Sequence, residues 1–126
     1  MSNKFTVEII SPDKLILKSE ASEVTIPSYE GEMGILKDHI PLITFLRPGL
    51  IEIGKNEKFY AEDGTVEFSN NNLLILSTTV QSLKNMKTEK ISIMLKEAEN
   101  RLSASEITDK QKYILNYKIE TLKQIN

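Results

Sequence analysis

The side chains that could perform chemistry gather in residues 30–39, which include Glu30, Glu32, Asp38 and His39. Two nearby carboxylates are the machinery of a glycoside hydrolase, so an enzyme with an acidic pair at Glu30 and Glu32 is one hypothesis. His39 is the single histidine, and the chain has no cysteine, so the usual ligands of a zinc site are missing. Adjacent residues such as Asp38 and His39 rarely present the geometry of a Ser-His-Asp triad. We interpret the acidic residues as solvated loop charges and His39 as a hydrogen-bonded loop residue.

Motifs for catalysis or cofactor binding do not occur. There is no G-x-S-x-G elbow and no Gly-rich phosphate loop ending in Lys-Ser or Lys-Thr. The net charge of −2 argues against nucleic acid as a partner, because phosphate binding needs a basic surface. No apolar run approaches the ~20 residues that span a bilayer, and the first residues lack the apolar core of a signal peptide. The sequence predicts a non-catalytic protein without metal or cofactor, built to bind other proteins.

Residues 1–84 have the pattern of an all-β sandwich of about ten short strands. Phe5, Val7 and Ile9 alternate with polar residues, which is typical of a half-buried strand, and turn residues recur at short intervals. Asp63-Gly64 predicts a β-hairpin between its flanking strands. The apolar run Leu73–Leu76 predicts a central strand that is covered on both faces.

Residues 85–126 predict an antiparallel hairpin of two helices. From Thr88 onward there is no glycine and no proline, and apolar residues recur at three- and four-residue spacing. Thr88 is the expected N-cap of the first helix and Ser105 that of the second. Residues 87–126 carry a net charge of +2, whereas residues 1–86 carry −4. Helices of this length are marginal alone, so the hairpin must rest on the sandwich or on a partner.

Residues 27–49 are both apolar and rich in turns, with glycines, prolines and a dense set of Ile, Leu and Phe. In a chain without catalytic residues, such a segment indicates a rigid contact surface. A sandwich corner with buried side chains has the same composition. The residues alone leave these two interpretations open.

The same segment resembles the epsilon subunit of F-type ATP synthases, which is called delta in mitochondria. Residues 30–49 read EGEMGILKDHIPLITFLRPG, close to the family's run E-G-E-x-G-I-L-P-G-H-A-P-L-x-T-x-L-x-P-G. Lys37-Asp38 replaces the family's Pro-Gly, so this turn is expected to differ in shape. The segments FTVEIISP (5–12), FYAEDGTVEF (59–68) and EAENRL (97–102) also resemble the family.

The resemblance implies a non-catalytic subunit of the rotor, which forms the central stalk of a proton-translocating ATP synthase and couples proton flow to ATP synthesis. Gly31 and Glu32 match positions that contact the c-ring, and His39, Ile43 and Thr44 match positions that face the gamma subunit. It further implies that the C-terminal helices reach the alpha/beta catalytic head and restrain ATP hydrolysis. The expected location is the cytoplasmic face of the bacterial inner membrane, where the complex holds the subunit without direct membrane insertion.

Some family members bind ATP through an I/L-D-x-x-R-A motif at the start of the first helix. Here the Asp is Lys87, the Arg is Lys90 and the Ala is Ile91. One charge is reversed, and a lysine does not replace the bidentate hydrogen bonds of an arginine. The sequence therefore predicts that ATP binding is weak or absent. An alternative function is a free-standing regulatory module that senses a nucleotide or binds a protein.

Overall fold

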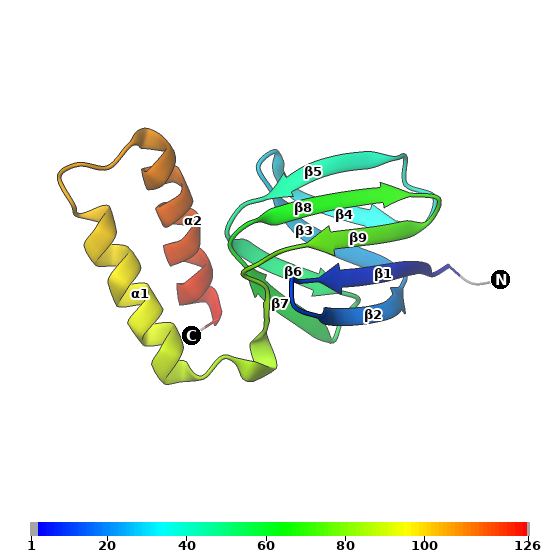
Figure 1. The fold of residues 1–126 in the computed structure, drawn as a ribbon, viewed down its shortest axis with the longest axis horizontal. Coiled ribbons are helices and arrows are strands. Elements are labelled where there is room, and N and C mark those ends of the chain that lie inside the picture. Colours follow the sequence, from blue (N-terminus) through cyan, green and yellow to red (C-terminus); the bar gives the residue numbers. More distant parts are fainter. Residues whose placement is uncertain (1–2, 126) are drawn as a thin grey trace.

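Ten strands precede two helices along the chain in the computed structural model, which describes residues 3–125 (Figure 1). This confirms the predicted fold class. The strands are β1 (Phe5–Ile10), β2 (Leu15–Ala21), β3 (Glu23–Ser28), β4 (Gly31–Leu36), β5 (Leu42–Leu46), β6 (Gly49–Ile53), β7 (Glu57–Ala61), β8 (Gly64–Ser69), β9 (Asn72–Leu76) and β10 (Gln81–Ser82). A short 3-10 helix, η1 (Leu83–Asn85), leads to α1 (Thr88–Leu102) and α2 (Asp109–Ile125). The predicted boundary between residues 84 and 85 falls within η1.

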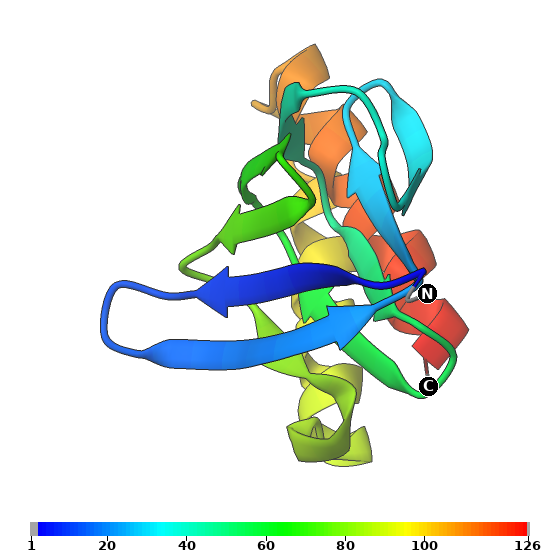
Figure 2. The ribbon, with the colours of Figure 1, turned by 90° about the vertical axis from the view of Figure 1, so that its right-hand side faces the viewer.

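The strands form one curled sheet that folds into two layers. The strand order is β10-β7-β6-β3-β5-β8-β9-β1-β2, with β4 paired to β3. A single residue pair, Ser28 with Leu46, joins β3 to β5, so the sheet divides there into a first layer (β10, β7, β6, β3, β4) and a second layer (β5, β8, β9, β1, β2). Figure 2 shows the long ribbon of β1 and β2 in front of the helices.

The core lies between the two layers. On β1, Phe5, Val7 and Ile9 are buried as their alternation predicts. The ring of Phe5 meets that of Phe68 from β8 edge to face, with centroids 5.4 Å apart, which is a favourable aromatic geometry. The second layer thus buries one face of each strand.

The other face of the second layer is open. Leu73–Leu76 forms a central strand as predicted, between β8 and β1, but the prediction that both of its faces are covered is wrong. Leu73 and Ile75 are buried, but 41% of Leu76 is exposed. A run of four apolar residues indicates a strand, yet it does not reveal whether a helix covers the outer side. Here the helices pack beside the first layer, where α2 contacts β6, and they leave the second layer uncovered (Figure 1).

The predicted hairpin at Asp63-Gly64 is also wrong. β7 pairs with β6 and β10, and β8 pairs with β5 and β9, so this turn carries the chain from one layer to the other. Ser77 Oγ donates to the carbonyl of Asp63 at 2.7 Å, which fixes the corner to the end of β9. Gly64 has φ 148°, and a Cβ there would lie 2.5 Å from the carbonyl oxygen of Leu76. The corner therefore needs glycine both for its backbone conformation and for its space.

Both helices of the hairpin have N-caps other than the predicted ones. Lys87 is the N-cap of α1 and makes no side-chain capping bond, so Thr88 is the first helical residue. At α2, Thr108 Oγ1 accepts from the amide of Gln111, and Gln111 Oε1 accepts from the amide of Thr108. This reciprocal capping box begins the second helix three residues after Ser105, which had been the expected cap.

Gly64→Ala is expected to destabilise the chain by about 2–4 kcal/mol, because alanine is strained at this φ and its Cβ meets backbone. Gly34→Ala is the matched control, since a Cβ at Gly34 meets nothing within 4 Å, and it should change stability by less than about 0.5 kcal/mol. Denaturant unfolding of the two variants measures the difference. Equal midpoints would contradict the role assigned to Gly64.

Candidate functional site

The outward side of the second layer carries two rows of side chains in register. Phe45, Thr65, Leu76 and Ile10 form one row, and Ile43, Glu67, Leu74 and Glu8 form the next. We call these eight residues the outer face. Among them Ile43 is 71% exposed and Phe45 58%. Apolar side chains exposed this far and close together are unusual on a monomer and indicate a contact surface.

Thr44 does not belong to the outer face. It lies between Ile43 and Phe45 on β5 and points inward, in register with Val66 and Ile75, and only 5% of it is exposed. Successive side chains of a strand point to opposite faces, so Ile43 and Thr44 cannot contact one partner from the same side. The structure therefore separates two neighbouring residues that the resemblance had grouped.

His39 lies in the connection between β4 and β5, at the end of β5 that is nearer to Ile43. Its ring meets the ring of Phe68 edge to face at 5.9 Å, and its Nδ1 lies 2.7 Å from the carbonyl oxygen of Ile40. If Nδ1 carries the proton and donates this bond, Nε2 is left to accept one from a partner. Ile40 beside it is 74% exposed, so this loop continues the apolar surface beyond Ile43.

The turn at Lys37-Asp38 keeps a conformation that glycine would favour. Asp38 has φ 66°, a left-handed value that Asn and Asp tolerate better than other side chains. Its amide donates to Asn71 Oδ1 at 2.7 Å, and Asn71 Nδ2 donates to Asp38 Oδ1 at 2.9 Å. These paired bonds join the β4–β5 loop to the β8–β9 turn. A glycine could not form the second bond, because it lacks the carboxylate.

Gly31 and Glu32 lie at the opposite end of the sandwich from His39. They begin β4, where Gly31 pairs with Ser28, and Ser28 in turn pairs with the last residue of β5. Gly31 has φ 118°, and its carbonyl accepts from Ser28 Oγ at 2.7 Å. Glu32 is exposed. The predicted site residues thus form two separate groups, one at each end of β5.

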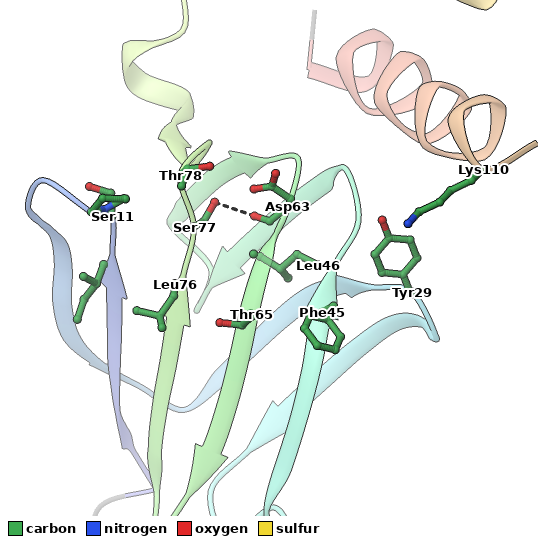
Figure 3. Close-up of a pocket in the computed structure, with 13 residues that line it drawn as sticks. Ser11, Tyr29, Phe45, Leu46, Asp63, Thr65, Leu76, Ser77, Thr78 and Lys110 are labelled. Carbon is green, nitrogen blue, oxygen red and sulfur yellow. Dashed lines mark hydrogen bonds between the residues drawn. The ribbon is translucent and has the colours of Figure 1, made fainter. Parts of the chain in front are cut away.

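A groove that the sequence reasoning missed opens on the outer face. Its volume is about 1110 Å³, and its apolar walls include Ile10, Phe45 and Leu76, with Asp63 and Lys110 at its edge (Figure 3). The wall residues come from strands that are distant in the sequence, which is why no local motif marks the groove. The alternation of Ile43 and Phe45 on one strand was the available signal.

Aromatic rings and one arginine attach α2 to the sandwich. Arg47 lies over the ring of Tyr117 at 3.7 Å, a cation–π contact of about 0.5–2 kcal/mol. Tyr29 stacks on Tyr113 with centroids 6.0 Å apart and planes 13° from parallel. Tyr113 also meets Tyr117 edge to face at 4.9 Å. The residues that directly follow β3 and β5, Tyr29 and Arg47, therefore hold one side of α2.

A charged contact holds the same helix to the end of β7. Lys118 Nζ lies 3.1 Å from Glu62 Oε2, and the hydroxyl of Tyr60 donates to that same oxygen at 3.0 Å. Tyr60 is fully buried. Burial, and next the charge of Glu62, raise the pKa of Tyr60 far above the usual value for tyrosine. Tyr60 also packs with Met86, Ile91 and Leu122 in the core between sandwich and helices.

Within residues 3–125, no group of three His, Cys, Asp or Glu side chains is placed to hold a metal ion. In the same residues, the helices are too short or too polar to cross a membrane. What the described surfaces offer is contact area: an open apolar sheet face with a groove, an ordered loop at His39, and an exposed hairpin at Gly31 and Glu32.

Comparison with known proteins agrees with this architecture. The model of the ATP synthase delta/epsilon chain, β-sandwich domain, matches residues 4–82. The ATP synthase epsilon chain of Pelagibacter ubique is 46% identical over 130 aligned residues, covering all of both chains. That of Desulfitobacterium hafniense is 36% identical and covers 86% of this chain and 85% of its own.

Two solved structures share the fold at low sequence identity. A chain of the Euglena gracilis mitochondrial ATP synthase (OSCP/F1/c-ring) superposes with a TM-score of 0.81 at 21% identity, covering 98% of this chain and 82% of its own. A chain of the Tetrahymena thermophila central stalk/c-ring structure gives 0.67 at 18% identity, covering 94% and 93%. A β-sandwich followed by a docked helical hairpin is thus an architecture found within ATP synthases. By its sequence, the chain belongs to the ATP synthase delta/epsilon family.

The raised pKa of Tyr60 predicts a loss of stability at alkaline pH. In the unfolded chain Tyr60 ionises near pH ~10, whereas the folded chain keeps its proton, so the folded state binds more protons above that pH. Stability is therefore unaffected by this group below pH ~10 and falls by about 1.4 kcal/mol per pH unit above it. Denaturant unfolding at several alkaline pH values measures the slope.

Tyr60→Phe is the control for this prediction, because phenylalanine fills the same space without an ionisable group. The variant should lose this part of the alkaline slope. Tyrosinate absorbance offers a second readout: of the four tyrosines, Tyr60 should ionise only as the chain unfolds. Ionisation of all four while the circular dichroism stays native would contradict the prediction.

Proposed function

We propose that this chain is the epsilon-type subunit of a proton-translocating ATP synthase, a non-catalytic part of the central stalk. It binds the gamma subunit through the outer face and the c-ring through the hairpin of β3 and β4, and so helps couple proton flow to ATP synthesis. The observation that carries the proposal is the open apolar outer face, with Ile43 71% exposed, in a chain of this family.

The contact with gamma is proposed to centre on Ile43 and His39. Ile43 is the most exposed apolar side chain of the outer face, and Phe45 extends the same apolar surface along β5. The rings and hydrogen bonds around His39 and Asp38 hold the adjoining loop in place, so little ordering cost opposes binding there. Because Thr44 is buried, we assign its side chain to the core and give its place in the contact to Phe45.

The contact with the c-ring is proposed at Gly31 and Glu32. The exposed Glu32 carboxylate offers a charged acceptor, and the bond from Ser28 to the carbonyl of Gly31 fixes the turn. This hairpin and the His39 loop lie at opposite ends of β5, which suits a subunit that joins two different partners. In this arrangement the complex holds the subunit at the cytoplasmic face of the inner membrane.

ATP is not a ligand in this proposal. At the start of α1, Ile91 packs with Tyr60, Met86 and Leu122 in the core beneath the hairpin and presents no polar group. Lys90 Nζ lies 3.1 Å from Gln81 Oε1, and Lys87 brings a positive charge where the family motif has a carboxylate. The alternative of a free-standing nucleotide sensor would need a nucleotide site at this position or elsewhere.

Ile43→Glu is expected to weaken gamma binding about 30-fold or more, the effect of losing an interface hot spot. The reason is that the variant places a charge beside Glu67 in the apolar contact. Ile93→Glu is the matched control, because Ile93 is 59% exposed on α1, away from the outer face, and it should bind as the parent chain does. Calorimetric titration with purified gamma measures both. Parent-like binding by the Ile43 variant would refute the assigned surface.

Glu32→Lys separates the second contact from the first. This variant should bind gamma normally, yet it should dissociate more readily from the complex that contains the c-ring, which a salt-dependent wash of the assembled complex would reveal. Glu20→Lys, at an exposed position on β2, is the control. Equal retention of the two variants would remove Glu32 from the proposed contact.

Calorimetric titration of the isolated chain with Mg-ATP should give no binding heat up to about 1 mM nucleotide. Any binding would then be weaker than a dissociation constant of about 1 mM, which corresponds to a binding free energy of about −4 kcal/mol. The physical reason is the reversed charge at Lys87 and the buried Ile91. Tight, magnesium-dependent binding would contradict this prediction and would favour the nucleotide-sensing alternative.

A further inference from the structure

Two carboxylates stand among the apolar side chains of the outer face. Glu67 of β8 and Glu8 of β1 lie in one row, on either side of Leu74 of β9. Ile43 of β5 stands next to Glu67 at the end of that row, so the order across the strands is apolar, acidic, apolar, acidic. Neighbouring strands lie about 4.8 Å apart, so the backbones of Glu8 and Glu67 are about 10 Å apart.

Neither of these two carboxylates has an ion-pair or hydrogen-bond partner within residues 3–125. Glu67 is exposed and Glu8 is half-buried, and the ion pairs of the described chain lie elsewhere, on the first layer and at the contact with α2. Lys18 of β2 is in register with Glu8, yet the two side chains form no ion pair. Water therefore satisfies both carboxylates in the free chain.

A partner that covers the outer face must displace this water. It cannot bury Ile43 and Leu74 together without covering Glu67, which stands between them, and Glu8 borders Leu74 on the other side. A carboxylate that leaves water without gaining a partner opposes binding strongly, whereas a basic side chain that pairs with it offsets the loss. A purely apolar partner surface therefore does not fit the outer face.

The charge of the whole sandwich points to the same kind of partner. Residues 1–86 carry a net charge of −4, and such a potential speeds the encounter with a basic surface, most of all at low salt. The lysines that border the outer face, Lys18 on the edge strand β2 and Lys110 at the groove, lie at its edges. Its centre thus remains acidic.

We propose that the outer face selects a surface of gamma that carries two Lys or Arg side chains about 10 Å apart, with an apolar side chain between them. The two cations pair with Glu67 and Glu8, and the apolar side chain packs on Leu74. Ile43 and Phe45 supply apolar contact, whereas the carboxylates supply specificity, because a surface without the cations leaves them unpaired. The inference rests on the proposed function and adds to it the chemistry of the surface that gamma presents.

Glu67→Gln in the full chain tests the proposal by the sign of its effect. If a cation of gamma pairs with Glu67, the variant leaves that cation buried without its partner, and the Kd for purified gamma should rise about 30-fold through faster dissociation. If the facing surface of gamma is apolar, the variant removes the loss of water from a carboxylate, and binding should tighten. Surface plasmon resonance measures both rates, and unchanged or tighter binding would overturn the proposal. Glu23→Gln, at an exposed position on β3 of the first layer, is the matched control and should bind as the parent chain does.

Glu8 lies nearer the edge of the outer face, next to Lys18 of the edge strand β2. Charges at the rim of an interface act mainly on the association rate and on its dependence on salt. Glu8→Gln should therefore slow association at low salt and flatten the salt dependence, whereas Lys18→Gln removes a cation and should bind gamma at least as tightly as the parent chain. Weaker binding by the Lys18 variant, or a parent affinity that does not fall as the salt concentration rises, would contradict a basic partner surface.

Charge exchange between the two proteins identifies the cations of gamma. Glu67→Lys should abolish measurable binding, and changing one Lys or Arg of gamma to Glu should restore it. If gamma binds the parent chain but no such change restores binding, the inference is refuted and the proposed function stands. If purified gamma does not bind the parent chain, both are refuted.

Discussion

At Asp63 and Gly64 the chain crosses from the first layer to the second. This crossing determines which layer lies beside the helices and which keeps an open face. Only glycine permits the close approach to the carbonyl of Leu76, and this approach lets β7 finish one layer while β8 starts the other. The first layer then has α2 beside it, in contact with β6. The second layer keeps a side that nothing within the described chain covers. An open apolar sheet face is costly for an isolated protein, and it becomes useful when a partner subunit completes it.

The two groups of candidate residues differ in how they are made rigid. The loop at His39 is fixed by contacts between segments distant in sequence, namely the Phe68 ring and the paired bonds between Asp38 and Asn71. The hairpin at Gly31 is fixed by its own neighbour, Ser28. The first group therefore depends on β8 and the β8–β9 turn, whereas the second meets the second layer at the end of β5, where Ser28 pairs with Leu46.

Sequence patterns predicted the strands and helices better than they predicted which of these elements lie side by side. The alternation of Phe5, Val7 and Ile9 predicts β1 and its buried face, because a strand carries that information within itself. Asp63-Gly64 predicts a change of direction, but whether the next strand pairs back or crosses to another layer depends on residues far along the chain. No local motif marks the groove, since its walls come from strands that are distant in sequence, among them β1, β5 and β9. The burial of Thr44 could have been predicted, because successive side chains of a strand point to opposite faces. If Ile43 faces a partner, Thr44 must face the core.

The parallel pairing of β1 with β9, which sets Val7 beside Leu73, also bears on how the chain folds. β1 is made before β9, and the edge of β1 that faces β9 stays unpaired until β9 has been made. The sandwich is therefore rich in contacts between residues that are distant in sequence. Such topologies fold slowly, because loop closure precedes any gain from pairing. During synthesis, β1 and β2 exist only as a two-stranded ribbon, which is marginal in water. The helices follow all ten strands along the chain, so the surface on which α2 docks can form before the helices are made.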